Sequence, residues 1–175
     1  MKRLGRIAIL LSLASALSCM PREVNVDALL TRVRNDFPNE RYSVTPSVAS
    51  IFIDESLPGG AELKAIMDDL TEMEVVVIPV DSSHTEESNK VFRIINKRID
   101  RQGLALIGKF RSEEEKVDVW LVQSEVISDL VVVNQTSSYI YVVRFKGEIN
   151  KRKVDELIHP ENRPILEYLY RLKAH

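Results

Sequence analysis

A short polar segment near the middle of the chain contains the residue types of a hydrolytic triad. Asp81, Ser83 and His84 lie within the stretch DSSH. A triad needs these groups to converge in space, and the chain lacks the G-x-S-x-G pattern that presents a serine nucleophile at a sharp turn. We therefore interpret the segment as a solvated loop that precedes a helix. A hydrolase in which these residues meet distant groups remains an alternative.

The remaining titratable residues show no metal-binding pattern. None of the three histidines is part of an H-x-x-x-H or H-E-x-x-H motif. Acidic pairs occur without the alternating spacing of a calcium loop. These pairs are Asp54-Glu55, Asp68-Asp69 and Glu86-Glu87. We expect no catalytic residue, no metal and no cofactor.

The single cysteine follows a secretory signal pattern. Lys2, Arg3 and Arg6 precede the apolar run 7–17, as in the charged and apolar regions of a signal peptide. Only 15 residues separate Arg6 from Arg22. A membrane-spanning helix needs roughly 20 predominantly apolar residues, so the run is short for a stable span. An uncleaved anchor helix is the competing interpretation.

The residues before Cys19 decide how this segment is processed. Ala16-Leu17-Ser18-Cys19 resembles a bacterial lipobox, in which the cysteine becomes the first mature residue and carries lipid. Ala16 occupies a position where the pattern prefers leucine, and Ala14-Ser15-Ala16 also fits an ordinary signal peptidase. We favour lipidation of Cys19, because the only cysteine of the chain stands at the end of the apolar run, directly after Ser18. Attached acyl chains would hold the protein stably at a bilayer. The mature domain then has no free thiol.

These features divide the chain into four parts. Residues 1–18 are expected to form the lipoprotein signal peptide, 19–25 a tether, 26–157 a folded domain and 158–175 a helical tail. Removal of the signal leaves 21 basic and 26 acidic residues, a net charge of −5. A mildly acidic domain of this kind is not expected to bind nucleic acid, which requires a basic surface.

Hydrophobic periodicity predicts the elements of the folded domain. Helices are expected at 26–37, near 47–53, at 63–70 and at 86–102, with Gly103 closing the last of these. Strands are expected at 41–45, 73–80, 104–111, 117–123, 129–133 and 139–146. Two short helices are expected around Pro160 and Pro164.

This order predicts an α+β fold with a mainly antiparallel sheet, helices packed on one face and a terminal β-meander. On the last strand, Tyr139, Tyr141, Val143 and Phe145 alternate with polar positions such as Arg144. We therefore expect one face of the meander to be packed and the other to be partly wet.

A basic stripe is expected on the helix at 86–102. Its cations follow one another at three- and four-residue spacing, with one beside them. They are Lys90, Arg93, Lys97 and Arg101, with Arg98 at the side. A solvated face paired with nearby acids is the simpler interpretation. The functional one is docking on an anionic surface, either lipid headgroups or an acidic partner.

The stretch DLVVVNQTSSYIYVVRFKGEINKRKVDEL, residues 129–157, resembles the end of the DUF4252 family of uncharacterised bacterial proteins. The run EVVVIPV, a helix that ends near Gly103, Gly147 after the last strand and the closing Leu157 also match that pattern. The resemblance covers about 24–157. It implies a short lipoprotein, mostly found in Bacteroidetes, and it assigns no catalytic or binding residue.

Together these observations predict a non-enzymatic envelope lipoprotein that binds or scaffolds an unknown envelope protein. Its partners would be the membrane, through the N-terminal lipid, and that protein. Met20-Pro21-Arg22 carries no acidic run after Cys19, which favours a periplasm-facing position over surface display. The alternative is a small-molecule or peptide binder that uses the sheet face or a strand edge, with Tyr139 and Tyr141 as contacts.

Overall fold

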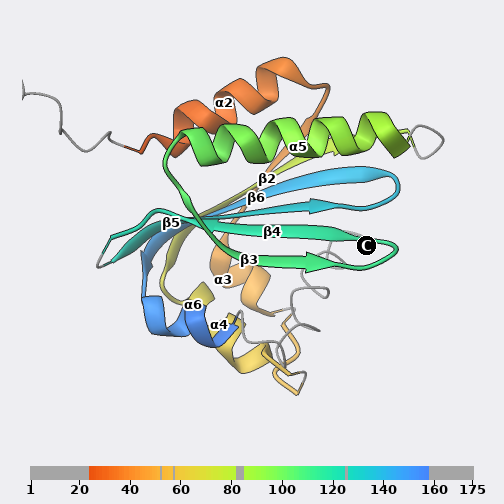
Figure 1. The fold of residues 1–175 in the computed structure, drawn as a ribbon. Helices are drawn as coiled ribbons and strands as arrows, with labels where there is room; N and C mark the ends of the chain where they lie inside the picture. The colour runs from red at the N-terminus through yellow and green to blue at the C-terminus, as the bar shows by residue number, and fades with distance from the viewer. Residues whose placement is uncertain (1–23, 52, 57, 82–84, 125, 158–175) are drawn as a thin grey trace, which may run out of the picture.

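The computed structural model describes residues 24–51, 53–56, 58–81, 85–124 and 126–157 (Figure 1). Within these ranges the helices are α2 (Val26–Asp36), α3 (Pro46–Ile51), α4 (Gly60–Met67), α5 (Thr85–Arg101) and α6 (Lys151–Leu157). The strands are β1 (Glu40–Val44), β2 (Leu70–Pro79), β3 (Ala105–Arg111), β4 (Lys116–Leu121), β5 (Ile127–Gln135) and β6 (Tyr139–Ile149). The predicted signal segment, Cys19 and the predicted tail from 158 to 175 lie outside the described residues.

All described strands belong to one antiparallel sheet. The strand order is β1-β2-β6-β5-β4-β3, so the four-stranded meander β3 to β6 adds its last strand to β2. Strand β6 pairs with β2 from Leu70↔Gly147 to Pro79↔Tyr139. The predicted α+β class, with a mainly antiparallel sheet that ends in a meander, is confirmed. The placement of β6 at the centre of the sheet required the tertiary structure.

Helices α2 and α5 form a layer on one face of the sheet (Figure 1). The inner face of α5 presents Phe92, Ile95 and Ile99, as their spacing predicts. These side chains pack with residues of α2 and with alternate residues of the central strands. Asn25 caps α2 by accepting a 2.8 Å hydrogen bond from the backbone N–H of Ala28.

Helices α3, α4 and α6 cover the opposite face (Figure 1). Leu63 and Ile66 of α4 and Val154 of α6 pack against the other set of alternating strand residues, such as Val143 and Phe145. The expectation that all helices pack on one face is therefore corrected, because each sheet face carries its own buried apolar cluster. The partly wet face predicted for the meander is wrong for the same reason.

Two glycines mark close backbone geometry in this architecture. Gly103, the second residue after α5, has a φ of 90°, as expected of a helix-terminating glycine. A Cβ at Gly147 would lie 2.1 Å from the carbonyl oxygen of Asp69. The start of β2 and the end of β6 thus approach more closely than any larger residue allows.

Candidate functional site

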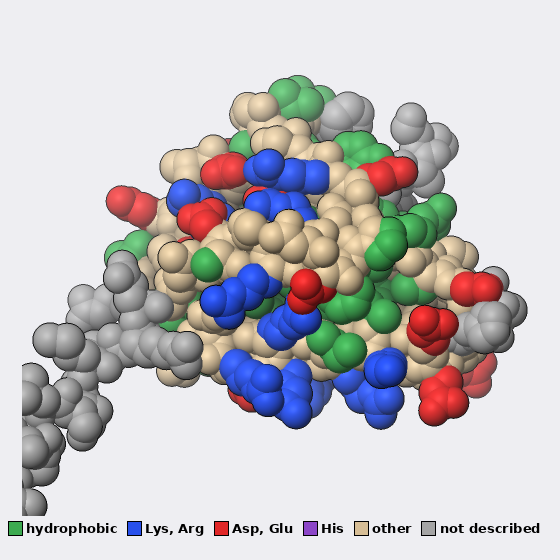
Figure 2. Space-filling view, turned by 90° about the horizontal axis from the view of Figure 1, so that it is seen from above, with side chains coloured by type: hydrophobic (Ala, Val, Ile, Leu, Met, Phe, Trp, Pro, Cys, Tyr) green, Lys and Arg blue, Asp and Glu red, His purple; other side chains and the backbone are tan. Residues whose placement is uncertain are grey.

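The predicted basic stripe lies on the outer side of α5. Lys90, Arg93, Lys97 and Arg101 are exposed, and they point away from the buried Phe92 side of the helix. Figure 2 looks down on the α2/α5 layer and shows Lys and Arg side chains distributed over this face. Acidic side chains are scattered among them, with several at the right-hand end of the view. We call these four residues the basic stripe.

Arg98 is the one cation of the predicted set that contacts α2. Its Nη2 lies 2.5 Å from Oδ2 of Asp36, and its guanidinium lies 5.5 Å from the ring centroid of Phe37. Arg98 therefore agrees with the simpler interpretation of the predicted stripe, in which each cation pairs with a nearby acid. The four residues of the basic stripe form no salt bridge with any described residue.

A buried ion network lies beneath α2. Arg144 of β6 is 3% exposed, and its Nε donates a 2.6 Å hydrogen bond to Oδ1 of Asp129 on β5. Its Nη1 donates to Oδ1 of Asp27 on α2 at 2.5 Å. The hydrogen bond from Arg144 lowers the pKa of Asp27. Burial disfavours the charged form of Arg144, but its bonds to Asp27 and Asp129 outweigh burial and raise its pKa.

A second buried acid ties α2 to the edge of the sheet. Glu74 of β2 is 3% exposed and is contacted by Arg34 of α2 and by Nε of Arg41 on β1 at 2.9 Å. The structure makes Glu74 and Arg144 register partners on neighbouring strands. These charges are structural links between α2 and the sheet, because each is satisfied within the fold.

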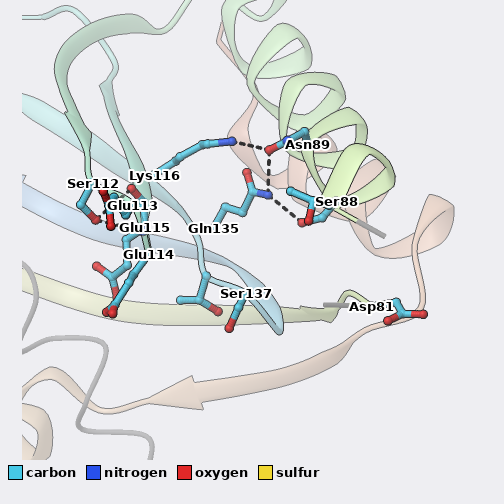
Figure 3. A pocket seen from close by; sticks show the side chains of 12 residues that line it. Asp81, Ser88, Asn89, Ser112, Glu113, Glu114, Glu115, Lys116, Gln135 and Ser137 are labelled. Carbon is cyan, nitrogen blue, oxygen red and sulfur yellow. Dashed lines mark hydrogen bonds between the residues drawn. The ribbon is translucent and has the colours of Figure 1, made fainter. Parts of the chain in front are cut away.

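A polar hollow of about 470 Å³ lies at the N-terminal end of α5 (Figure 3). Gln135 of β5, which is 6% exposed, lies at its base. Its Nε2 donates to Oγ of Ser88 at 2.7 Å and to Oδ1 of Asn89 at 3.1 Å, and Lys116 also donates to Asn89. The rim includes Glu113 and other acids of the β3–β4 turn (Figure 3). Sequence reasoning missed this hollow, because its residues come from three separate segments.

The triad residue types are not brought together in the described structure. Asp81 is exposed at the end of β2 and borders the polar hollow. Ser83 and His84 lie outside the described residues. Among described residues no group of three or more His, Cys, Asp or Glu side chains could hold a metal ion. No described helix is long and apolar enough to span a membrane.

The acidic pairs have local structural roles. Asp54 accepts hydrogen bonds from the Oγ (2.6 Å) and the backbone N–H (2.9 Å) of Ser56, which lower its pKa. Asp69 accepts from Nζ of Lys153 at 2.8 Å and so links α6 to the loop after α4. Glu86 and Glu87 occupy the first turn of α5, where negative charge is favourable.

The two tyrosines proposed as ligand contacts differ in exposure. Tyr139 is 42% exposed, whereas Tyr141 packs partly against the cluster under α3, α4 and α6. Their ring centroids lie 5.9 Å apart. Burial is the main cause that raises the pKa of Tyr141. Helices cover both faces of the sheet, so the sheet face offers no open surface for the ligand predicted from the sequence. A peptide could still add to the sheet at its edge strands, β1 and β3.

A family model covers most of the folded domain. The model for a domain of unknown function, DUF4252, matches residues 42–157. The chain belongs to the DUF4252 family. The match begins inside β1 and continues through α6, so it includes α5 and the whole sheet core of this DUF4252 domain, whereas α2 precedes it. No curated protein and no solved structure matches the chain.

Proposed function

We propose that this DUF4252 protein is a membrane-anchored envelope lipoprotein whose domain binds or scaffolds a partner without catalysing a reaction. Cys19 would carry the lipid, and the domain would face the periplasm. The observation that supports a working surface is the basic stripe. Its four cations are exposed and have no ionic partner among the described residues, whereas several other cations of the domain, such as Arg144 and Lys153, are paired. The stripe would dock on an anionic surface.

The anchor is tested by incorporation of a labelled fatty acid, followed by fractionation, for wild type and Cys19→Ala. We expect label in membrane-bound wild type and none in the variant, which has no acylation site. Equal labelling of the two proteins, or a soluble wild-type protein, would contradict the anchor.

The stripe is tested by charge reversal in the full chain. Arg93→Glu/Lys97→Glu should lose most binding to anionic vesicles or envelope extracts at low salt, because surface charges act over about 30 Å at roughly 0.01 M ionic strength. Lys109→Glu/Lys151→Glu is the matched control, because both positions are exposed and lie outside α5. Binding that is unchanged in the stripe variant, or equally lost in the control, overturns the docking role.

The polar hollow favours a second candidate function, the binding of a small polar ligand. Hydroxyl and amide groups line it, including Ser88, Asn89 and Gln135, and such groups orient ligands through hydrogen bonds. Gln135→Leu should remove ligand-induced thermal stabilisation by polar compounds such as amines and sugars. The control is Thr71→Val on β2, at the opposite end of the sheet. Absence of any stabilising compound for wild type argues against this candidate.

A further inference from the structure

A second hollow, also of about 470 Å³, lies between α2 and α5 on the face that carries the basic stripe. It is lined by Leu29, Arg32, Asp36, Arg98, Arg101 and Gln102. Three guanidinium groups therefore surround a space that contains one carboxylate. That carboxylate is already held by Arg98, at 2.5 Å. Arg32 and Arg101 are exposed and form no salt bridge with a described residue.

Arg98 lines this hollow with its guanidinium held in place. Stacking over Phe37 and the bond to Asp36 orient its guanidinium. Its Nη1 is buried and has no hydrogen-bond partner among the described residues. A buried charge without an acceptor is unfavourable, and an anion held in the hollow by Arg32 and Arg101 would offset this positive charge electrostatically. Arg32 and Arg101, which are exposed, would contact such an anion first.

The polypeptide enters the domain at the same end of the layer. Val24 packs against the α2/α5 cluster, and a Cβ on Gly103 would lie 3.8 Å from its Cγ2. Gly103 follows Arg101 and Gln102 directly. A chain spans at most about 3.6 Å per residue, so the five steps from Cys19 to Val24 reach no more than roughly 18 Å. A lipid on Cys19 would keep this end of the α2/α5 layer close to the bilayer surface.

We infer that the hollow between α2 and α5 binds the phosphate of an anionic phospholipid headgroup, with the basic stripe lying along the same bilayer. This inference rests on the lipid anchor of the proposed function. Arginine forks match phosphate oxygens in geometry and charge. The short tether favours a lipid over an acidic protein, because the bilayer is always within reach of Arg32 and Arg101. The inference adds Arg32 to the cations of α5, and it defines which face of the domain meets the membrane.

The test uses the lipidated full-length mature protein reconstituted in vesicles. Cys19 is the only cysteine of the chain, so a single introduced cysteine can carry a fluorophore. Asn35→Cys places the fluorophore on an exposed position of α2, and Ser47→Cys places it on α3 in the opposite layer as a control. Vesicles contain phosphatidylcholine alone, or with about a quarter phosphatidylglycerol to supply the anionic surface that attracts basic residues. Brominated lipid quenches fluorophores that lie near the bilayer.

We expect quenching at Asn35 to increase several-fold when phosphatidylglycerol is present, and quenching at Ser47 to stay unchanged. Arg32→Ala/Arg101→Ala should remove most of the increase. Lys90→Ala/Arg93→Ala removes the same charge farther from the hollow and should remove less. Unchanged fluorescence of Trp120 will verify that each variant is folded.

Three results would overturn the site. The first is quenching at position 35 that does not change with phosphatidylglycerol. The second is an equal increase in quenching at position 47, and the third is an equal loss of the increase in the two double variants. An acidic protein that protects Asn35 when phosphatidylglycerol does not would also overturn it, in favour of a protein partner. A wild-type chain without acyl groups overturns the anchor and the inference together. If the chain is acylated but quenching at position 35 does not change with phosphatidylglycerol, the phosphate site is overturned and the lipid anchor is not.

Discussion

Arg144 and Asp129 form a buried ion pair between neighbouring strands beneath α2. Asp129 lies diagonally across from Arg144, because the register places Val131 opposite Arg144, and the Nε–Oδ1 distance is 2.6 Å. Both residues are almost fully buried, at 3% and 8% exposure. The pair therefore holds charge inside a layer that is otherwise largely apolar. Only Asp27 gives the guanidinium a second carboxylate among the described residues.

Loss of Asp129 should destabilise the domain strongly. Asp129→Asn leaves a buried guanidinium with one exposed carboxylate partner, and breaking a buried pair costs about 3–5 kcal/mol. Urea unfolding followed through the fluorescence of Trp120, the only tryptophan, measures the change. Lys109→Ala, at an exposed position of β3, is the control and should change little. An effect of Asp129→Asn no larger than that of the control would refute the structural role of the pair.

Asp27 should contribute a pH-dependent part of the stability. Its pKa is lowered in the folded protein, chiefly by the hydrogen bond from Arg144. The stabilisation is therefore complete above the unfolded value of about 3.9 and is lost as the pH falls through the folded value. Because the side chain is 74% exposed, solvent screens the pair and we expect less than about 1 kcal/mol.

The measurement for Asp27 compares the unfolding free energies of wild type and Asp27→Asn from neutral to acidic pH. The difference should be constant near neutrality and shrink below about pH 4, where the aspartate of the unfolded chain becomes protonated. A difference that persists or grows in acid would contradict the assignment. Added salt should reduce the difference at neutral pH.

Gly147→Ala should separate the ends of β2 and β6. The new Cβ would lie 2.1 Å from the backbone oxygen of Asp69, which also accepts a 3.1 Å hydrogen bond from Glu148. We expect a loss of about 3 kcal/mol, because backbone atoms must move to relieve the clash. Gly108→Ala is the matched strand control, since its closest neighbour is a side-chain atom of Phe110 at 3.3 Å. Similar stabilities of the two variants, measured by thermal unfolding, would show that the close approach is not rigid.

Asn134→Val should stabilise the domain. Asn134 is fully buried on β5 between Val117 and Tyr141, and neither amide atom has a hydrogen-bond partner among the described residues. Replacing an unsatisfied polar group by a β-branched apolar one should raise the unfolding free energy by about 1 kcal/mol. Asn134→Ala should gain less, because it leaves a void. Destabilisation by Asn134→Val would reveal that the amide has a partner in solution.

Local sequence patterns located most of the helices and strands. The inner face of α5 and the turn at Gly103 followed from period and residue type, because helix geometry repeats every 3.6 residues. The helix expected at 63–70 ends at Met67, and Leu70 begins β2. An apolar residue at the correct spacing fits either structure over so short a run, so the boundary was not decided locally.

The basic stripe is a case where the sequence predicted a surface but not its setting. The spacing placed Lys90, Arg93, Lys97 and Arg101 together on α5. It gave no sign that Arg98 would pair with Asp36 or that Arg32 would border the same hollow, because α2 lies far away in the sequence. Contacts between such distant segments depend on how the layers pack, which no local pattern encodes.

By itself the sequence determined the positions of the helices and strands, the single cysteine behind a signal pattern and the line of cations on one helix. The tertiary structure alone decided that β6 pairs with β2, that helices cover both sheet faces and that Arg144 is buried with Asp129. The physical reason is that alternation along a strand assigns side chains to two opposite sheet faces, but it contains no information on which elements cover each face. Arg144 looked like a solvent-facing residue until α2 and β5 supplied its carboxylates.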